Sequence, residues 1–227
     1  RLLCGLSTAE QNLVWGDDGV FSLQYQGSPG AAYKPVLLGT GCGAISRMAV
    51  AEQNGFVAWM ANTRQFFIFR GVSSYSLGKP EIIKCPVQKD VFDNLNESQQ
   101  FKCHAGINPE FSEVWFFYPD QRDGTGKECS RVAVVDWTAA VWSQHTIART
   151  AWQSSGIYGK PVGYGTDGYI YRHEEGNTAN GALVPAEITS AAFDAGDGDA
   201  LAIFDSIIPD WKDQSGNVEY TIFYRLW

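Results

Sequence analysis

The glycine-rich segment Gly39–Ala44 is the first candidate for chemistry, because it matches the G-x-G-x-x-G/A pattern of dinucleotide sites. That pattern follows a strand and opens a helix, whose N-terminus binds the pyrophosphate, and an acid about 20 residues further on binds the ribose. Val36–Leu38 suits the strand. However, Asn54-Gly55 turns the chain soon afterwards, and no acid lies between Glu52 and Glu81. We therefore interpret the segment as a glycine-rich connection between strands.

A cluster of three aspartates, Asp194, Asp197 and Asp199, has carboxylate oxygens that suit a hard cation. An EF-hand loop places acids at alternate positions and ends in a glutamate, and this segment lacks that arrangement. We favour a β-turn with solvated carboxylates, and calcium binding stays as the alternative.

Residue types that serve in catalysis are present, but they do not occur at the spacing of known catalytic motifs. His104, His145 and His173 have no partners at the spacing of metal ligands or of a triad, and neither G-x-S-x-G nor H-E-x-x-H occurs. Glu113 and Asp136 fall on predicted strands and would suit a glycosidase if their carboxylates lay about 5 to 9 Å apart. We expect that the chain is not an enzyme and holds no cofactor or metal, with a glycosidase as the catalytic alternative.

The composition is typical of a large all-β domain. It argues against a protein that binds nucleic acid or crosses a membrane. The 227 residues are 44% hydrophobic and 14% aromatic, with 24 glycines, and the formal net charge of -8 argues against a surface that binds phosphates. No apolar run approaches the roughly 18 residues of a membrane span. The five cysteines are scattered, with no C-x-x-C pair, which indicates reduced thiols and assembly in a cytosol.

A recurring hairpin signature gives the strongest signal for the fold. Apolar and aromatic residues flank a few turn residues in Val14–Phe21, Ala58–Phe69 and Gly163–Tyr171. Degenerate hairpins that recur in this way are typical of propeller blades of about 40 to 50 residues. We predict propeller-type blades of antiparallel hairpins, and helical spacing between Pro86 and Asn96 adds one short helix.

The chain changes character after Gly176. We predict propeller-like blades over residues 1–176 and a C-terminal β segment over 177–227, which forms a closing blade or a small sandwich. Its expected strands are Glu187–Phe193, Leu201–Ile208 and Val218–Leu226. The chain begins at Arg1 and ends within a strand pattern, so we expect a segment of a longer polypeptide.

Several distinctive strings follow one another in a fixed order along the chain. The most specific is Ala105–Pro119, which contains Asn-Pro-Glu-Phe-Ser-Glu-Val-Trp. The others are Gly41–Gly43, Phe56–Met60, Phe67–Phe69, Val91–Asn96, Val132–Trp137, Val141–Ser143, Ala148–Trp152, Gly165–Tyr171, Phe193–Asp199 and Ile207–Asp210. In this order the strings resemble the packaged-DNA stabilisation proteins, or tail nozzle proteins, of short-tailed bacteriophages, and the resemblance extends from about Leu13 over nearly the whole chain.

The resemblance implies a structural virion component that is assembled in the host cytoplasm. Proteins of this family form a ring, expected here to be a hexamer, below the portal and its adaptor, and they neighbour the tail spike, fibre or needle proteins. The ring retains the packaged genome and forms the channel for its ejection. The resemblance assigns no catalytic residues to this chain.

A conduit for double-stranded DNA should not bind it, because each neutralised phosphate adds affinity through counterion release. We therefore hypothesise that some of Asp194, Asp197, Asp199 and the pair Glu174-Glu175 face the channel or a neighbouring subunit. The main alternative is a carbohydrate-binding propeller for host attachment, in which exposed Trp and Tyr side chains stack on sugars.

Overall fold

A computed structural model describes residues 1–9, 11–28, 31–53, 55–71, 78–176, 178–179, 181–183, 206, 208 and 218–223. The chain divides into two compact units, Arg1–Gly176 and Asn177–Trp227. Antiparallel sheets dominate the described residues, which confirms the all-β class. Among these residues, no helix combines the length and the apolarity needed to cross a bilayer.

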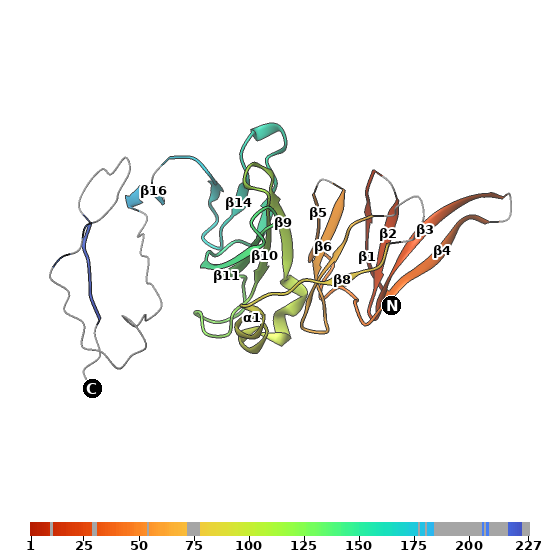
Figure 1. Cartoon of the computed structure of the whole chain (residues 1–227), viewed down its shortest axis with the longest axis horizontal. Helices are drawn as coiled ribbons and strands as arrows, with labels where there is room; N and C mark the ends of the chain where they lie inside the picture. Colours follow the sequence, from red (N-terminus) through yellow and green to blue (C-terminus); the bar gives the residue numbers. More distant parts are fainter. Residues whose placement is uncertain are drawn as a thin grey trace. The chain divides into compact units, whose positions relative to one another are not determined.

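The first unit consists of four antiparallel sheets that follow one another along the chain (Figure 1). Neighbouring strands in each sheet are consecutive in sequence, so every sheet is an up-and-down meander. The strands of the first two sheets are β1 (Leu2–Ser7), β2 (Asn12–Gly16), β3 (Gly19–Ser28), β4 (Ala31–Thr40), β5 (Val50–Gln53), β6 (Phe56–Met60), β7 (Phe66–Phe69) and β8 (Glu81–Ile82). Those of the last two are β9 (His104–Asn108), β10 (Glu113–Tyr118), β11 (Arg131–Asp136), β12 (Val141–Thr146), β13 (Ala151–Gln153), β14 (Val162–Tyr164) and β15 (Ile170–Arg172).

The predicted hairpins are confirmed, and the turns at Gly168 and Gly55 have the expected positive φ. Gly19 in the first signature does not have it, and in the second the left-handed residue is Arg64, with a φ of +62°. Gly168, between β14 and β15, has a φ of +84°, and the Gly165 amide donates to the Tyr169 carbonyl across the turn. Gly55, between β5 and β6, has a φ of +85°. Only glycine adopts this left-handed region freely, which explains why Asp-Gly and Asn-Gly mark hairpins.

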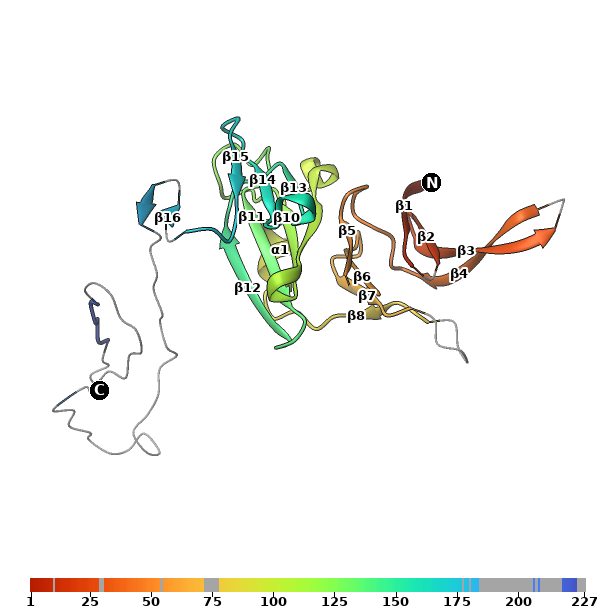
Figure 2. The same ribbon diagram turned by 90° about the horizontal axis from the view of Figure 1, so that it is seen from above.

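Successive sheets of the first unit pack face to face through three apolar cores (Figure 2). Between the first and second sheets, the rings of Trp15 and Trp59 lie 5.5 Å apart. Between the second and third, Phe66 and Phe116 are 4.9 Å apart. Trp152 of the fourth sheet stacks on a tryptophan of the third at 4.8 Å. The two middle sheets thus bury both faces, which explains near-continuous apolar runs such as Phe56–Met60.

The first strands of the second, third and fourth sheets are neighbours, a relation that is typical of propeller blades. Met48 and His104 form a parallel bridge, and the Ala105 amide donates to the Met48 carbonyl at 2.8 Å. From β9 to β13, Trp152 donates its indole N–H to the Ile107 carbonyl at 3.0 Å. First strands recur at intervals of about 50 residues, close to the predicted blade length. Closure of these meanders into a ring stays a prediction.

The predicted helix is confirmed as α1 (Gln88–Asn94), which buries Val91 and Phe92. Phe92 packs 5.3 Å from Phe66, so the helix covers the core between the second and third sheets. The further helical segments are short 3-10 turns, η1 (Glu97–Lys102), η2 (Pro109–Phe111) and η3 (Gly156–Tyr158).

The second unit is described only in part. Its described strands are β16 (Thr178–Ala179) and β17 (Ala182–Leu183), which pair antiparallel. The strand predicted at Val218–Leu226 is wrong over residues 218–223, which are exposed and lie outside any strand. The preference of such residues for strands acts through packing on a half-buried surface, and these side chains are exposed. The strand predicted at Glu187–Phe193 lies outside the described residues, as does Leu201–Ile208 apart from Ser206 and Ile208, which are not in a strand.

A buried carboxylate holds the arginine that joins the β10–β11 loop to α1. Asp120 is fully buried and accepts a hydrogen bond from Nη2 of Arg122 at 2.6 Å. Arg131 lies 3.4 Å from the same carboxylate. Arg122 also donates to Asp90 of α1 at 2.9 Å, and these hydrogen bonds lower the pKa of Asp90.

We predict that Asp120→Asn lowers the free energy of unfolding by about 2 kcal/mol or more, because two guanidinium groups then lose their buried counter-charge. Urea denaturation followed by tryptophan fluorescence would measure the change. The control is Asp93→Asn, which breaks an exposed pair with Arg64 and should cost less than about 1 kcal/mol. Equal effects of the two substitutions would contradict the stabilising role assigned to the buried Asp120 carboxylate.

Candidate functional site

The glycine-rich segment Gly39–Ala44 is a connection between sheets, as predicted. It runs from the end of β4 towards β5, and no helix lies between these strands. A Cβ on Gly43 would come within 2.3 Å of the Asp17 carbonyl oxygen. Glycine is therefore needed here for a close approach of two backbones, and the helix N-terminus that binds a pyrophosphate is not built.

The histidine environments do not support nucleophilic catalysis. The Nδ1 atom of His104 lies 3.8 Å from Sγ of Cys129. Burial lowers the pKa of His104 to about 4 and raises the pKa of Cys129 to about 12. Both groups are therefore neutral near pH 7, whereas a reactive cysteine needs its thiolate. His145 is exposed, and its Nε2 lies 2.9 Å from Oγ of Ser143.

The two carboxylates considered for a glycosidase are cross-strand neighbours with separate partners. Glu113 and Asp136 face each other in the register of β10 and β11. Oδ1 of Asp136 accepts hydrogen bonds from the amides of Thr138 and Ala139, at 2.7 and 2.9 Å, and so closes the turn before β12. Glu113 accepts from the Trp115 indole at 2.8 Å. Each carboxylate thus has a local structural partner.

The structure describes only two of the five acids proposed from the sequence, Glu174 and Glu175. Asp194, Asp197 and Asp199 lie outside the described residues. Within the described part of the chain, no group of three or more His, Cys, Asp or Glu side chains could hold a metal ion. Glu175 forms an exposed ion pair with Arg172 at 2.9 Å.

Glu174 belongs to a carboxylate cluster at the end of the third and fourth sheets. Nδ2 of the buried Asn108 donates to Glu174 and to Glu113, in both cases at 3.2 Å. Burial raises the pKa of Glu174, and the carboxylates of Glu113 and Glu110 raise it further. Lys160 pairs with Glu110 and neutralises part of the cluster.

A cationic and aromatic layer lies beside this cluster. Arg149 donates from Nε to Nε2 of His173 at 3.0 Å, and its guanidinium lies 4.1 Å from the ring centre of Tyr171. The ring of His173 packs 4.7 Å from Trp152. Burial, followed by the charge of Arg149, lowers the pKa of His173 to about 4. His173 therefore acts as a neutral acceptor that holds the arginine in place.

Sequence reasoning missed Asn108 and Arg149 as members of this site. Asn108 is 66 residues from Glu174, and no local spacing connects them. The only signal in the sequence was that Glu174 follows the strand pattern that ends at Tyr171.

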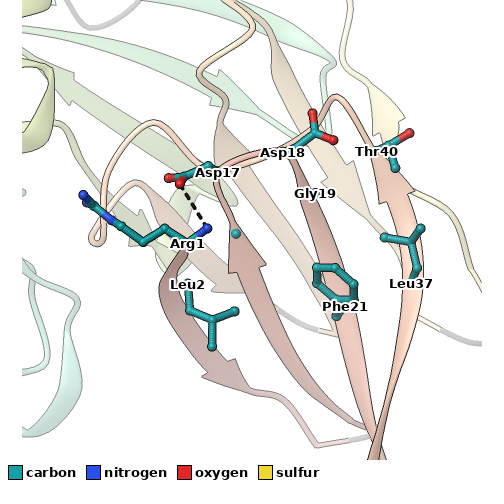
Figure 3. A pocket seen from close by; sticks show the side chains of 9 residues that line it. Arg1, Leu2, Asp17, Asp18, Gly19, Phe21, Leu37 and Thr40 are labelled. Atoms are coloured by element: carbon teal, nitrogen blue, oxygen red, sulfur yellow. Dashed lines mark ion pairs between the residues drawn. The ribbon is translucent and has the colours of Figure 1, made fainter.

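An open apolar hollow of about 420 Å³ lies on the outer face of the first sheet (Figure 3). Leu2, Phe21 and Leu37 form its apolar part, and Asp17 and Asp18 border it from the turn between β2 and β3. The hollow offers apolar contact area with acids at one end, and its lining contains neither a histidine nor a cysteine.

Comparison with known proteins adds no family: no protein-family model matches the chain, and no curated protein matches it.

We predict that Glu174→Gln raises stability at pH 7, by less than about 1 kcal/mol, and leaves it unchanged near pH 3. A carboxyl whose pKa is raised by folding is harder to ionise in the native state, so its ionisation subtracts from stability as the pH rises. Thermal unfolding at both pH values would measure the difference.

The control for this substitution is Glu175→Gln, which removes the neighbouring exposed acid and its pair with Arg172. It should show no gain at pH 7. A loss of stability for Glu174→Gln that is equal at both pH values would refute the interpretation that ionised Glu174 destabilises the folded state.

Proposed function

We propose that this chain is a structural component of a phage tail, a ring-forming nozzle below the portal and its adaptor that retains packaged DNA and forms the ejection channel. The observation that carries the proposal is that four antiparallel meanders pack on one another in sequence order, with adjacent first strands in the last three. It fits the propeller that the resemblance to tail nozzle proteins implies. The protein would be located in the virion, and no enzymatic activity is proposed.

The protonation states of the described cysteine and histidine side chains support a structural role in the wall of a channel. Burial raises the pKa of the thiols of Cys4 and Cys85 to about 11 and about 12 and so keeps them protonated. Near pH 7 the buried histidines are neutral as well. Groups in these states transfer protons and attack carbonyls poorly.

The charge distribution supports weak interaction with DNA. The formal net charge is -8. Six of the 17 Lys and Arg side chains are paired with carboxylates, namely Arg64, Lys102, Arg122, Arg131, Lys160 and Arg172. A cation that is already paired with a carboxylate is less available to bind a phosphate. A DNA duplex would therefore pass such a surface without being retained by it.

Partners follow from the proposed place in the tail. Copies of the chain would form a ring, which we propose to be a hexamer, with the portal or adaptor on one side and spike, fibre or needle proteins on the other. Double-stranded DNA would be a transient occupant of the channel.

One observation favours carbohydrate binding as a second candidate function. Tyr25 and Tyr33 are exposed on the hairpin of β3 and β4, with ring centres 5.6 Å apart. Exposed aromatic rings are the groups on which sugars stack. The larger Trp15 and Trp59 are fully buried, however, and contribute to the core.

We predict that the purified chain forms rings in electron micrographs, leaves duplex DNA unshifted in gel electrophoresis at physiological salt, and gives no signal on a glycan array. A nozzle protein assembles into rings, so rings are expected in the micrographs. A chain with net negative charge binds duplex DNA weakly, so the mobility of the DNA in the gel should not change. Monomers that bind a specific glycan would contradict the nozzle and support the attachment protein, and Tyr25→Ala would then abolish the glycan signal.

A further inference from the structure

The carboxylates of Glu110, Glu113 and Glu174 gather at one end of the third and fourth sheets. They come from η2, from the first residue of β10 and from the segment after β15. The negative charges of the first two act on Glu174. Lys160 offsets part of this charge through its ion pair with Glu110. Among the described residues, no Lys or Arg forms an ion pair with Glu113 or Glu174, so these two carboxylates have no counter-ion of their own.

The side-chain amide of Asn108 lies between these two carboxylates. Its Nδ2 is 3.2 Å from an oxygen of Glu113 and 3.2 Å from an oxygen of Glu174. The asparagine is fully buried, and its Oδ1 has no hydrogen-bond partner among the described residues. A buried amide oxygen without a partner costs free energy, and most buried polar atoms in proteins are paired. This oxygen therefore indicates a ligand at the cluster.

The positions of the three side chains suit a calcium ion. A turn of the Asn108 amide by 180° exchanges Nδ2 and Oδ1, which brings the oxygen beside both carboxylates. Its distance to an oxygen of each glutamate would then be close to 3.2 Å. Oxygen ligands at about 2.4 Å from Ca²⁺ lie about 2.8 to 3.4 Å from their neighbours, so the spacing fits.

We propose that Glu113, Glu174 and Asn108 bind one Ca²⁺ ion, with water as the remaining ligands. Two carboxylates balance the charge of the ion, and a carboxamide oxygen is a common third ligand. The Trp115 indole donates to Glu113 at 2.8 Å and so orients this carboxylate from outside the ligand set. Glu174 is exposed, which gives the ion a path from the solvent.

The bound ion would connect the third sheet to the segment that follows the fourth. Asn108 and Glu174 are 66 residues apart, so motif spacing could not predict this set, and the expectation of no metal came from such spacing. The inference is independent of the proposed function, because it depends only on the contacts of these side chains.

The test is equilibrium dialysis of the full chain, freed of metal with EDTA, against radioactive calcium at pH 7. It compares the wild type with Glu174→Gln and Glu113→Gln, each of which removes one ligand charge. The matched control is Glu175→Gln, which removes the neighbouring exposed acid and its pair with Arg172. Thermal unfolding in EDTA checks the fold of every variant, and Glu174→Gln should then be at least as stable as the wild type.

We expect the wild type and Glu175→Gln to bind one ion with a Kd of about 10⁻⁵ to 10⁻³ M, and both ligand variants to bind it at least tenfold more weakly. Calcium should raise the unfolding temperature of the wild type by a few degrees and leave that of Glu174→Gln unchanged. Equal binding by the wild type and Glu174→Gln would overturn the site, since the ion would then be held elsewhere in the chain. The absence of bound calcium at about 5 mM, which exceeds the expected Kd, would overturn it as well.

Discussion

The structure depends on apolar packing between the faces of successive sheets. A sheet in the middle of such a stack must be apolar on both faces, so its strands lose the alternation of a half-buried strand. Phe66–Phe69 and Val132–Val135 are buried at every position for this reason. The aromatic residues follow from the same constraint, because large rings such as Trp59 fill the space between sheets, which lie about 10 Å apart.

Polar residues and a glycine hold several loops and connections of the first unit in place. Asp120 pairs with two arginines where the chain passes from β10 to β11, and Gly43 lets two backbones approach. Asn108 places its amide between two glutamates at the end of β9. Each of these residues thus has a structural role in the described part of the first unit.

Much of the fold could be predicted from the sequence, because hairpins and the helix are local. The Asp-Gly turn at Gly168 needs a positive φ, and Val87, Val91 and Leu95 recur at helical spacing. The strand expected within residues 218–223 was wrong, since a strand depends on a neighbour that local pattern does not specify.

The candidate site could be predicted only in part. Glu174 was selected for its charge, but its contact with Asn108 arises from the packing of the fourth sheet on the third. Sequence spacing carries no information on such a contact. The same limit applies to Arg149, whose partner His173 lies on the far side of the β14–β15 hairpin.

A double-mutant cycle between Phe66 and Phe116 tests the face-to-face packing most directly. Their rings are 4.9 Å apart and belong to different sheets, so the free energies of unfolding should show a coupling of about 0.5–1.5 kcal/mol. The matched cycle pairs Phe66 with Phe117, which belongs to the core on the opposite face of the third sheet, and should be additive. Additive effects for Phe66 and Phe116 would contradict the stacked sheets on which this account depends.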